Sequence, residues 1–353
     1  MNNLDMYQQV AKIKVFGIGG AGNNAINRMV DDGLQGVEFY VANTDLQVLN
    51  VSLVKNKLIL GSDGLGAGGN PENGRRAAQE SENEIREAVK GADMVFITTG
   101  LGGGTGTGAA PLFAKAAKES GALTVAIVTK PFGFEGKRRM SQAEEGLEQL
   151  RQYTDSLIVV SNNQLLEVIG RIPFKDAFKE ADNVLRQGVQ TITDLIAVPA
   201  LINLDFADVK SVMQNQGTAL IGIGMASGEE KAVEAAQNAI TSPLLEAQIE
   251  GASKAIINVT GGESITIYDA HDAVEHIRQS AGRDIDIIFG VAINEQLGDA
   301  IIVTVIATGF ELPAQPEKEP IGFKTTVTKH IEPQELFEDT EEDNSIPDFF
   351  RRR

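Results

Sequence analysis

Short apolar runs alternate with helical patterns from residue 13 to about residue 160 of this 353-residue chain. This alternation is typical of parallel strands joined by crossover helices. The runs are apolar almost throughout, which indicates strands buried on both faces of a sheet. The pattern therefore predicts an α/β fold built on a parallel sheet. We expect its strands at Ile13–Phe16, Val37–Val41, Lys57–Leu60, Met94–Thr98, Leu123–Val128 and Ser156–Val160.

The second half of the chain has a different pattern. A long helix is predicted from Asp176 to about Val198, because apolar residues recur there at helical spacing and form one stripe. At 1.5 Å per residue it would span roughly 34 Å, enough to connect two domains. The strands and helices beyond it predict a mixed α/β domain whose last two strands form an antiparallel hairpin. These strands are Ala219–Met225, Lys254–Val259, Ile285–Ile293 and Ala300–Ala307, and the helices are Glu229–Ile240 and Ala270–Ala281.

The composition changes again after residue 310. Residues 311–353 contain three prolines in their first ten positions, and eleven acidic against six basic residues. This composition predicts a disordered acidic tail. Its last residues, Ile346–Arg353, place two aromatics and three arginines after an acidic stretch. A short apolar and basic segment on a disordered tether is typical of a docking peptide, and an inert frayed terminus is the alternative.

Composition argues against several classes of site. The chain has no cysteine, which excludes disulfides, thiolate nucleophiles and cysteine metal sites, and its three histidines make a three-histidine metal site improbable. The net charge of −18 argues against nucleic-acid binding, which relies on a basic surface. No apolar run reaches 18 residues and the N-terminus lacks a signal-peptide pattern. We therefore expect a soluble cytoplasmic protein with no direct transmembrane anchor.

The glycine-rich run Gly102–Gly108 follows a predicted buried strand and precedes a predicted helix. Glycine can adopt positive φ and can bring successive backbone N–H groups close to an anion. The N-terminus of the following helix would point at the same anion. A flexible linker is disfavoured between two buried elements, and no Gly-Lys-Ser/Thr follows, which excludes the lysine-bearing phosphate loop. The run predicts a phosphate cradle made of backbone and hydroxyl donors.

A second glycine cluster, Gly17–Asn24, follows the first predicted strand. It satisfies the G-x-G-x-x-G dinucleotide pattern, and Asp45 lies 23 residues beyond its last glycine, near the place of a ribose-binding acid. Taken alone, the cluster indicates an NAD-dependent oxidoreductase. Two phosphate loops on adjacent strand ends favour a nucleoside triphosphate instead, and the chain offers no convincing partner for hydride transfer. The oxidoreductase stays as the alternative.

These motifs together resemble the tubulin and FtsZ superfamily. The run Gly102–Gly108 matches the family signature GGGTGTG, and the partner motifs follow in the family's order along nearly the whole chain. The ending Ile-Pro-Asp-Phe-Phe-Arg resembles the terminal partner-binding peptide of the FtsZ branch, which tubulins lack. The partner motifs are Gly19–Asn24, Ala42–Asp45, Gly66–Pro71, Thr129–Gly136 and Asn203–Asp208.

The resemblance implies a bound GTP or GDP accompanied by Mg²⁺, with magnesium ligands that the sequence does not identify. Glu135 and Arg139 match the ribose-side residues of the family, and Phe178 and Asp182 match the residues that hold the base. The implied nucleotide-binding set is Gly19, Gly20, Ala21, Gly22, Asn23, Asn24, Gly103, Gly104, Thr105, Gly106, Thr107, Glu135, Arg139, Asn162, Phe178 and Asp182.

The base-binding pair is chemically reasonable for guanine. A ring at Phe178 can stack on a purine, and a carboxylate one helical turn later can accept the N1–H and N2–H₂ donors of guanine. Adenine has an acceptor at N1 and would leave that carboxylate unpaired. Many relatives place Asn before Asp here, whereas this chain has Asp182 before Asn183, so either residue could face the base.

Neither glycine loop has a general base nearby in the sequence. Asp205 and Asp208 lie on one face of a predicted helical turn, where they could orient a water toward the γ-phosphate. A plain N-cap with a first-turn acid is the alternative. The resemblance adds Asn203 to this catalytic set and places the loop at the end of the subunit opposite the nucleotide. A head-to-tail contact would then complete the site, and such contacts generate filaments.

The resemblance as a whole implies a cytoplasmic GTPase whose filaments scaffold the bacterial division ring at the inner face of the membrane. Its partners would be further copies of itself and, through Ile346–Arg353, membrane-tethering and regulatory division proteins. A scaffold that binds GTP without hydrolysing it is a further alternative. The implied domains are a Rossmann-like GTP-binding domain (1–175), a central helix (176–200), a C-terminal α/β domain with the catalytic loop (201–310), an acidic linker (311–343) and a terminal peptide (344–353).

Overall fold

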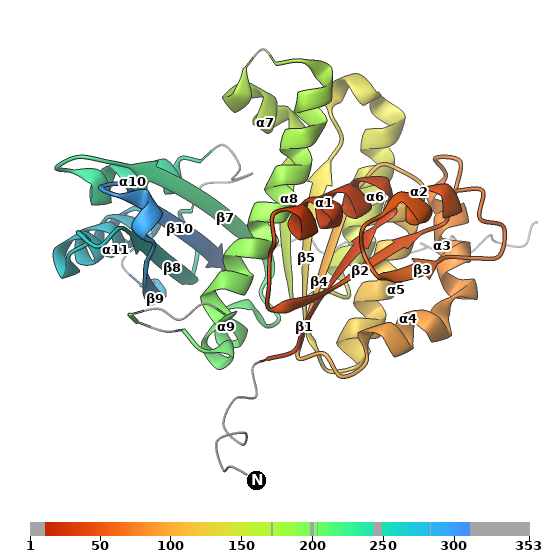
Figure 1. Ribbon diagram of the computed structural model, residues 1–353, viewed down its shortest axis with the longest axis horizontal. Helices are drawn as coiled ribbons and strands as arrows, with labels where there is room; N and C mark the ends of the chain where they lie inside the picture. Colours follow the sequence, from red (N-terminus) through yellow and green to blue (C-terminus); the bar gives the residue numbers. More distant parts are fainter. Residues whose placement is uncertain are drawn as a thin grey trace, which may run out of the picture. The chain divides into compact units, whose positions relative to one another are not determined.

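The computed structural model describes residues 11–170, 172–197, 201–202, 204–242, 249–282 and 284–310. The strands form one ten-stranded sheet in the order β3-β2-β1-β4-β5-β6-β7-β10-β8-β9 (Figure 1). They are β1 Ile13–Ile18, β2 Val37–Asn43, β3 Asn56–Ile59, β4 Met94–Gly100, β5 Leu123–Lys130, β6 Ser156–Ser161, β7 Gly217–Ala226, β8 Lys254–Gly261, β9 Asp286–Ile293 and β10 Ile301–Thr308.

The helices lie between these strands in the chain. They are α1 Gly19–Asp31, α2 Leu46–Val51, α3 Pro71–Glu80, α4 Glu82–Val89, α5 Thr105–Glu119, α6 Lys137–Arg151, α7 Asn162–Ile169, α8 Phe174–Ala197, α9 Phe206–Met213, α10 Lys231–Ile240 and α11 Ile267–Ala281, with 3₁₀ turns η1 Gly133–Glu135 and η2 Glu295–Leu297. The two segments that were predicted as the acidic linker and the terminal peptide lie outside the described residues.

The first six strands are all parallel, in the order 3-2-1-4-5-6 of a Rossmann-like fold. Strands β1, β4 and β5 are buried almost from end to end, as their continuous apolar sequences predict. One apolar core lies between the sheet and the helices α1 and α8, and a second lies between the opposite face and the helices α4, α5 and α6. The prediction of an α/β fold with a parallel sheet is confirmed.

The predicted hairpin of the last two strands is wrong. β8 lies between β9 and β10, and β10 pairs antiparallel with both β7 and β8. β10 is buried at nearly every position, whereas β9 is exposed or half-buried at most of its positions. A continuously apolar strand is stabilised by a neighbour on each edge, so β10 occupies the interior of the sheet and β9 its edge.

Helix α8 corresponds to the predicted long helix and begins two residues earlier than expected. Figure 1 shows it between β1–β5 and β7–β10. Its apolar stripe is buried at Ala181, Leu185, Val189 and Ile192. These side chains share a core with Ile158 of β6 and Ile306 of β10. The stripe therefore packs against both halves of the sheet.

The packing of β7 against α10 leaves no space for a side chain at Gly224. A Cβ atom there would overlap the backbone of Ala235 and Ala239. Replacing Gly224 by Ala should lower the free energy of unfolding by about 1–3 kcal/mol, the usual cost of overpacking. Urea denaturation followed by circular dichroism measures this loss. The control is Met225→Ala, because the neighbouring side chain of Met225 is 56% exposed. This variant should change the free energy of unfolding by less than about 0.5 kcal/mol. An equal loss in both variants would contradict the packing argument.

Candidate functional site

The two glycine loops lie side by side at the carboxyl ends of β1 and β4, which are paired neighbours in the sheet. A Cβ atom on Gly19 would lie 2.8 Å from the backbone nitrogen of Gly106, so the loops touch through their backbones. The Thr99 hydroxyl also donates a hydrogen bond to the Ile18 carbonyl at 2.8 Å. The absence of side chains at both glycines is what allows this approach.

Helices α1 and α5 begin directly in these loops. Neither helix has a side-chain hydrogen bond at its N-cap, which is also true of α4, α6, α7 and α10, but α1 and α5 are the two that begin in paired glycine loops. The first backbone N–H groups of a helix have no intrahelical partner, and together with the helix dipole they attract anions. Two uncapped N-termini at one edge of a parallel sheet form a cradle that fits a polyphosphate. We call the segments Gly19–Asn24 and Gly103–Thr107 the phosphate cradle.

Two cradle residues direct their side chains into the protein. The amide nitrogen of Asn23 donates to the Gly17 carbonyl at 2.7 Å and to the Ala42 carbonyl at 3.3 Å, and its oxygen accepts from Asn43. The Thr107 hydroxyl accepts the Gly102 N–H at 2.8 Å. Both side chains are buried. Within the described structure, these two residues support the cradle and present only their backbones toward a ligand.

Thr44, which the sequence analysis did not assign to the site, contacts the cradle directly. Its hydroxyl oxygen lies 2.7 Å from that of Thr105, and the two share one hydrogen bond. Thr44 follows β2, the neighbour of β1 in the sheet. The sequence analysis singled out the motif Ala42–Asp45, which contains Thr44. Sequence spacing alone does not show which side chain of this motif reaches the cradle.

The predicted ribose-side residues lie beside the second loop. Glu135 in η1 and Arg139 in α6 form an ion pair with each other, and Glu135 also accepts the Phe132 N–H at 2.9 Å. The Arg139 carbonyl lies 2.8 Å from where a Cβ atom of Gly102 would be. Asn162 begins α7 at the end of β6, two strands away from β4, and it is buried. Its assignment to the site stays a prediction.

The predicted base-binding residues lie near the start of α8. Phe178 is 37% exposed. Its ring meets those of Phe132 and Phe134 edge-on, with centroids 5.1 Å and 6.4 Å away. Phe132 and Phe134 stack on each other at 5.0 Å. The sequence motif Thr129–Gly136 contains both phenylalanines, but only the folded chain brings them to Phe178. Phe178 and Phe134, which are 37% and 55% exposed, offer an apolar surface suited to a planar base, and the buried Phe132 packs beneath them.

Asp182 faces the helix that begins the cradle. Its Oδ2 lies 3.4 Å from Nε of Arg28 in α1, and its side chain is buried. Burial raises the pKa of Asp182 to about 6, an effect that the nearby Arg28 guanidinium opposes. The Asn183 amide instead donates to Glu180 on its own helix at 3.1 Å. The contact of Asp182 or Asn183 with a base stays a prediction.

Asp205 and Asp208 form a capping box at the start of α9. The Asp208 N–H donates to Asp205 at 2.9 Å, and the Asp205 N–H donates to Asp208 at 3.0 Å. The alternative interpretation, an N-cap followed by an acid in the first turn, therefore describes their local structure. Each carboxylate can still accept further hydrogen bonds. Asn203, the third residue of the predicted catalytic set, lies outside the described residues.

The capping box and the phosphate cradle lie at opposite edges of the sheet. The last turn of α9 is hydrogen-bonded to Ser156, the first residue of β6, at the amino edge of the parallel strands. The cradle lies at their carboxyl edge. Figure 1 shows α9 on the side at which β1 begins. The structure does not bring the predicted catalytic carboxylates to the cradle of the same chain.

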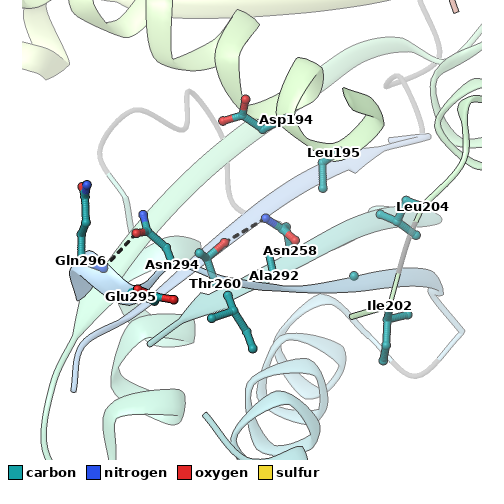
Figure 2. Close-up of a pocket in the computed structure, with 12 residues that line it drawn as sticks. Asp194, Leu195, Ile202, Leu204, Asn258, Thr260, Ala292, Asn294, Glu295 and Gln296 are labelled. Carbon is teal, nitrogen blue, oxygen red and sulfur yellow. Dashed lines mark hydrogen bonds between the residues drawn. The ribbon is translucent and has the colours of Figure 1, made fainter. Parts of the chain in front are cut away.

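A pocket of about 560 Å³ lies next to Leu204, the residue before the predicted catalytic Asp205. Figure 2 shows Asp194 and Leu195 of α8 on one side and residues of β8, β9 and η2 on the other, with Ile202 and Leu204 at one end. Burial raises the pKa of Asp194, and a hydrogen bond from Gln190 partly opposes this increase.

Two findings concern metal ions and membranes. Among the residues that the structure describes, no cluster of three or more acidic or histidine side chains could hold a metal ion. Within the same residues, no helix combines the length and the apolar character needed to cross a bilayer.

The sheet order and the two glycine loops at helix N-termini are typical of α/β proteins that bind nucleoside phosphates. Residues 12–170 match the family model of the tubulin/FtsZ GTPase domain, and residues 217–311 match that of the FtsZ C-terminal domain. A solved FtsZ dimer from M. jannaschii is 47% identical over 86% of this chain and 90% of that one, with a TM-score of 0.82. CetZ2 from Haloferax volcanii, solved as a protofilament with GTPγS, is 21% identical over 84% of this chain and 92% of that one, and its TM-score of 0.73 shows a common fold.

The chain belongs to the FtsZ family and is a GTPase. The resemblance found in the sequence is confirmed, and so is the predicted enzyme class. Membership of a GTPase family implies binding of GTP and GDP, and it disfavours the dinucleotide reading of Gly17–Asn24. The roles of the individual residues stay predictions.

The raised pKa of Asp182 predicts a pH-dependent affinity for GTP. An ionised carboxylate accepts two guanine donors, whereas a protonated one loses acceptor capacity. With a pKa of about 6, most Asp182 side chains are ionised at pH 7.5 and most are protonated at pH 5.5. The affinity should therefore fall about fourfold over this interval through this group alone.

Equilibrium dialysis with radiolabelled GTP at both pH values measures this effect. Asp182→Asn is the matched control, because the phosphates of GTP titrate equally in both proteins while the carboxylate is absent. The variant should bind GTP more weakly and lack the extra pH dependence. Parallel affinity curves for the two proteins would contradict the assignment of Asp182 to the base.

Proposed function

We propose that this chain is a cytoskeletal GTPase that assembles head to tail and hydrolyses GTP at the junctions between subunits. The observation that carries the proposal is the separation of the phosphate cradle from Asp205 and Asp208 by the height of the sheet. One subunit cannot direct these carboxylates at its own nucleotide. A second subunit stacked in the same orientation would place its α9 over the open cradle of the first.

In this arrangement the cradle holds the phosphates through backbone N–H groups, and Phe178 and Asp182 hold the guanine. A bound Mg²⁺ would neutralise charge on the phosphates. Asp205 and Asp208 of the next subunit would orient the attacking water and polarise it toward the γ-phosphate. Both carboxylates are already held in one orientation by their capping box.

Exposed apolar side chains near the cradle and near the predicted catalytic loop support a contact of this kind. Leu65 is 89% exposed and pairs through its backbone with Asp45, close to the cradle. Leu201, four residues before Asp205, is 68% exposed, and it lines one apolar groove of about 500 Å³ together with Ile267, which is 80% exposed. Two different surfaces that bind each other make a heterologous contact, which extends into a filament when it does not close.

At the level of the cell, we propose that these filaments scaffold the bacterial division ring at the inner face of the membrane. The segment Ile346–Arg353 would bind membrane-tethering and regulatory division proteins, and its three arginines would add attraction to anionic headgroups. Deleting residues 346–353 tests this role. GTP turnover should stay at the wild-type rate while recruitment to the division site is lost.

The shared site predicts that GTP turnover depends on protein concentration. Phosphate release per subunit should rise steeply above a threshold concentration, at which the protein also begins to sediment, because only assembled subunits have a complete site. Phosphate release and sedimentation are measured in parallel from nanomolar to micromolar protein. A rate per subunit that stays constant down to nanomolar concentrations would rule out a site shared between subunits.

Asp208→Asn tests the assignment of the catalytic loop. The variant should bind GTP with wild-type affinity and sediment with GTP, while phosphate release falls by about 10²-fold or more, as expected for loss of a group that activates water. Asp269→Asn is the matched control, since Asp269 occupies the same position in the capping box of α11. Loss of GTP binding in Asp208→Asn would show that the loop is wrongly placed.

A further inference from the structure

The last turn of α9 is held by side chains from three strands. A helix leaves its last four carbonyl groups without partners inside the helix. In α9, the carbonyl of Lys210 accepts the N–H of Gln214 at 2.9 Å. The remaining three carbonyls, those of Ser211, Val212 and Met213, each accept a hydrogen bond from a side chain outside the helix.

Three donors come from the ends of different strands. The Ser156 hydroxyl donates to the Met213 carbonyl at 2.6 Å, and the Thr308 hydroxyl donates to the Val212 carbonyl at 2.7 Å. The ammonium group of Lys254 donates to the Ser211 carbonyl at 2.8 Å. Ser156 begins β6, Thr308 ends β10 and Lys254 begins β8. We call Ser156, Thr308 and Lys254 the α9 anchors.

The α9 anchors lie in one row along the edge of the sheet. Thr308 pairs in register with Lys254, and Ser156 pairs with Gly217 of β7, which lies between β6 and β10. The row therefore joins the parallel strands to the antiparallel ones. Ser156 and Thr308 are fully buried, where water cannot replace a lost hydrogen bond to the helix.

The chain that leaves α9 is tied to the same edge. Asp155, which precedes Ser156, accepts the Asn215 N–H with its carboxylate at 3.3 Å. Its backbone carbonyl accepts the N–H groups of Gln216 and Gly217, both at 2.9 Å. The second oxygen of the same carboxylate accepts the Thr124 N–H of β5 at 2.8 Å. Both the helix end and the residues after it are therefore fixed to the sheet.

The N-terminal end of α9 has a different environment. Its capping box consists of hydrogen bonds between Asp205 and Asp208, which set the local shape but do not attach the helix to the rest of the protein. The pocket in Figure 2 lies beside Leu204, the residue before the box. Leu204 and Val209, on either side of Asp205, are buried in the apolar core, and the anchors add directed hydrogen bonds at the other end of the helix to this packing in fixing the two carboxylates.

We propose that the α9 anchors are positioning residues for GTP hydrolysis, an inference that rests on the proposed catalytic role of Asp205 and Asp208. α9 has eight residues and a length of about 12 Å, so a tilt at its last turn moves its first turn directly. Misplacement of a reacting group by about 1 Å can lower a rate about a hundredfold. Loss of an anchor should therefore reduce turnover and leave the phosphate cradle intact.

Thr308→Val is the principal test, because it removes one hydroxyl and keeps the shape of the side chain. Phosphate release per sedimented subunit should fall at least about tenfold, while GTP affinity of the unassembled protein stays at the wild-type value. Thr308→Ser keeps the hydroxyl and should restore most of the rate. Ser156→Ala and Ser156→Thr form a second pair with the same expectation.

Thr241→Val is a control for the loss of a threonine hydroxyl at a helix end. It removes an exposed hydrogen bond, 2.7 Å long, from the hydroxyl to the Gln237 carbonyl at the end of α10, a helix without predicted site residues. Its turnover should stay within about twofold of wild type. If the buried variants do not fold, Lys254→Met tests the same proposal at the exposed anchor, with the same expected loss.

The outcomes separate this inference from the proposed function. Wild-type turnover in Thr308→Val, Ser156→Ala and Lys254→Met, together with an inactive Asp208→Asn, would overturn the anchoring role alone. Wild-type turnover in Asp208→Asn would overturn the catalytic loop itself. Equal losses in Thr308→Ser and Thr308→Val would also overturn the anchoring role, because the hydroxyl would then not be the group that matters.

Discussion

Helix α8 packs its apolar stripe into one core that draws side chains from both halves of the sheet. Leu185, Val189 and Ile192 are almost fully buried there, and burial of each such side chain stabilises the fold by about 1.5–3 kcal/mol. The same core contains Ile306 of β10 and Val212 of α9. The two halves of the sheet therefore pack against the same helix, and their strands are joined in one continuous sheet.

This packing also sets the distance between the two parts of the site. Phe178 and Asp182 lie near the beginning of α8, beside the helix that starts the cradle. The predicted catalytic residues Asp205 and Asp208 follow the end of α8, a helix of 24 residues. A helix of this length spans about 36 Å. Because its stripe is buried on both sides, α8 keeps the loop and the cradle at opposite edges of the sheet.

Two reciprocal ion pairs join α8 to α1. Arg28 of α1 lies beside Asp182 of α8, and Asp32 at the end of α1 lies 3.1 Å from Arg186 of α8. Burial alone would favour a neutral Asp182, and the Arg28 guanidinium favours its charged form. The helix that begins the phosphate cradle thus also influences the charge of the residue predicted to read the base.

The sequence alone determined the strands, the two glycine loops and the family, because burial periodicity and backbone freedom are local properties that appear in neighbouring residues. It missed the place of β10 between β7 and β8, since strand order depends on which long-range pairing covers the most apolar surface. It did not show that Asn23 and Thr107 turn their side chains inward, that Thr44 contacts Thr105 of the cradle, or that Phe132 packs against Phe178. Only the tertiary structure decided that Ser156, Thr308 and Lys254 would meet at one helix end, because hydrogen bonds between residues up to 96 positions apart form only where the fold places them together.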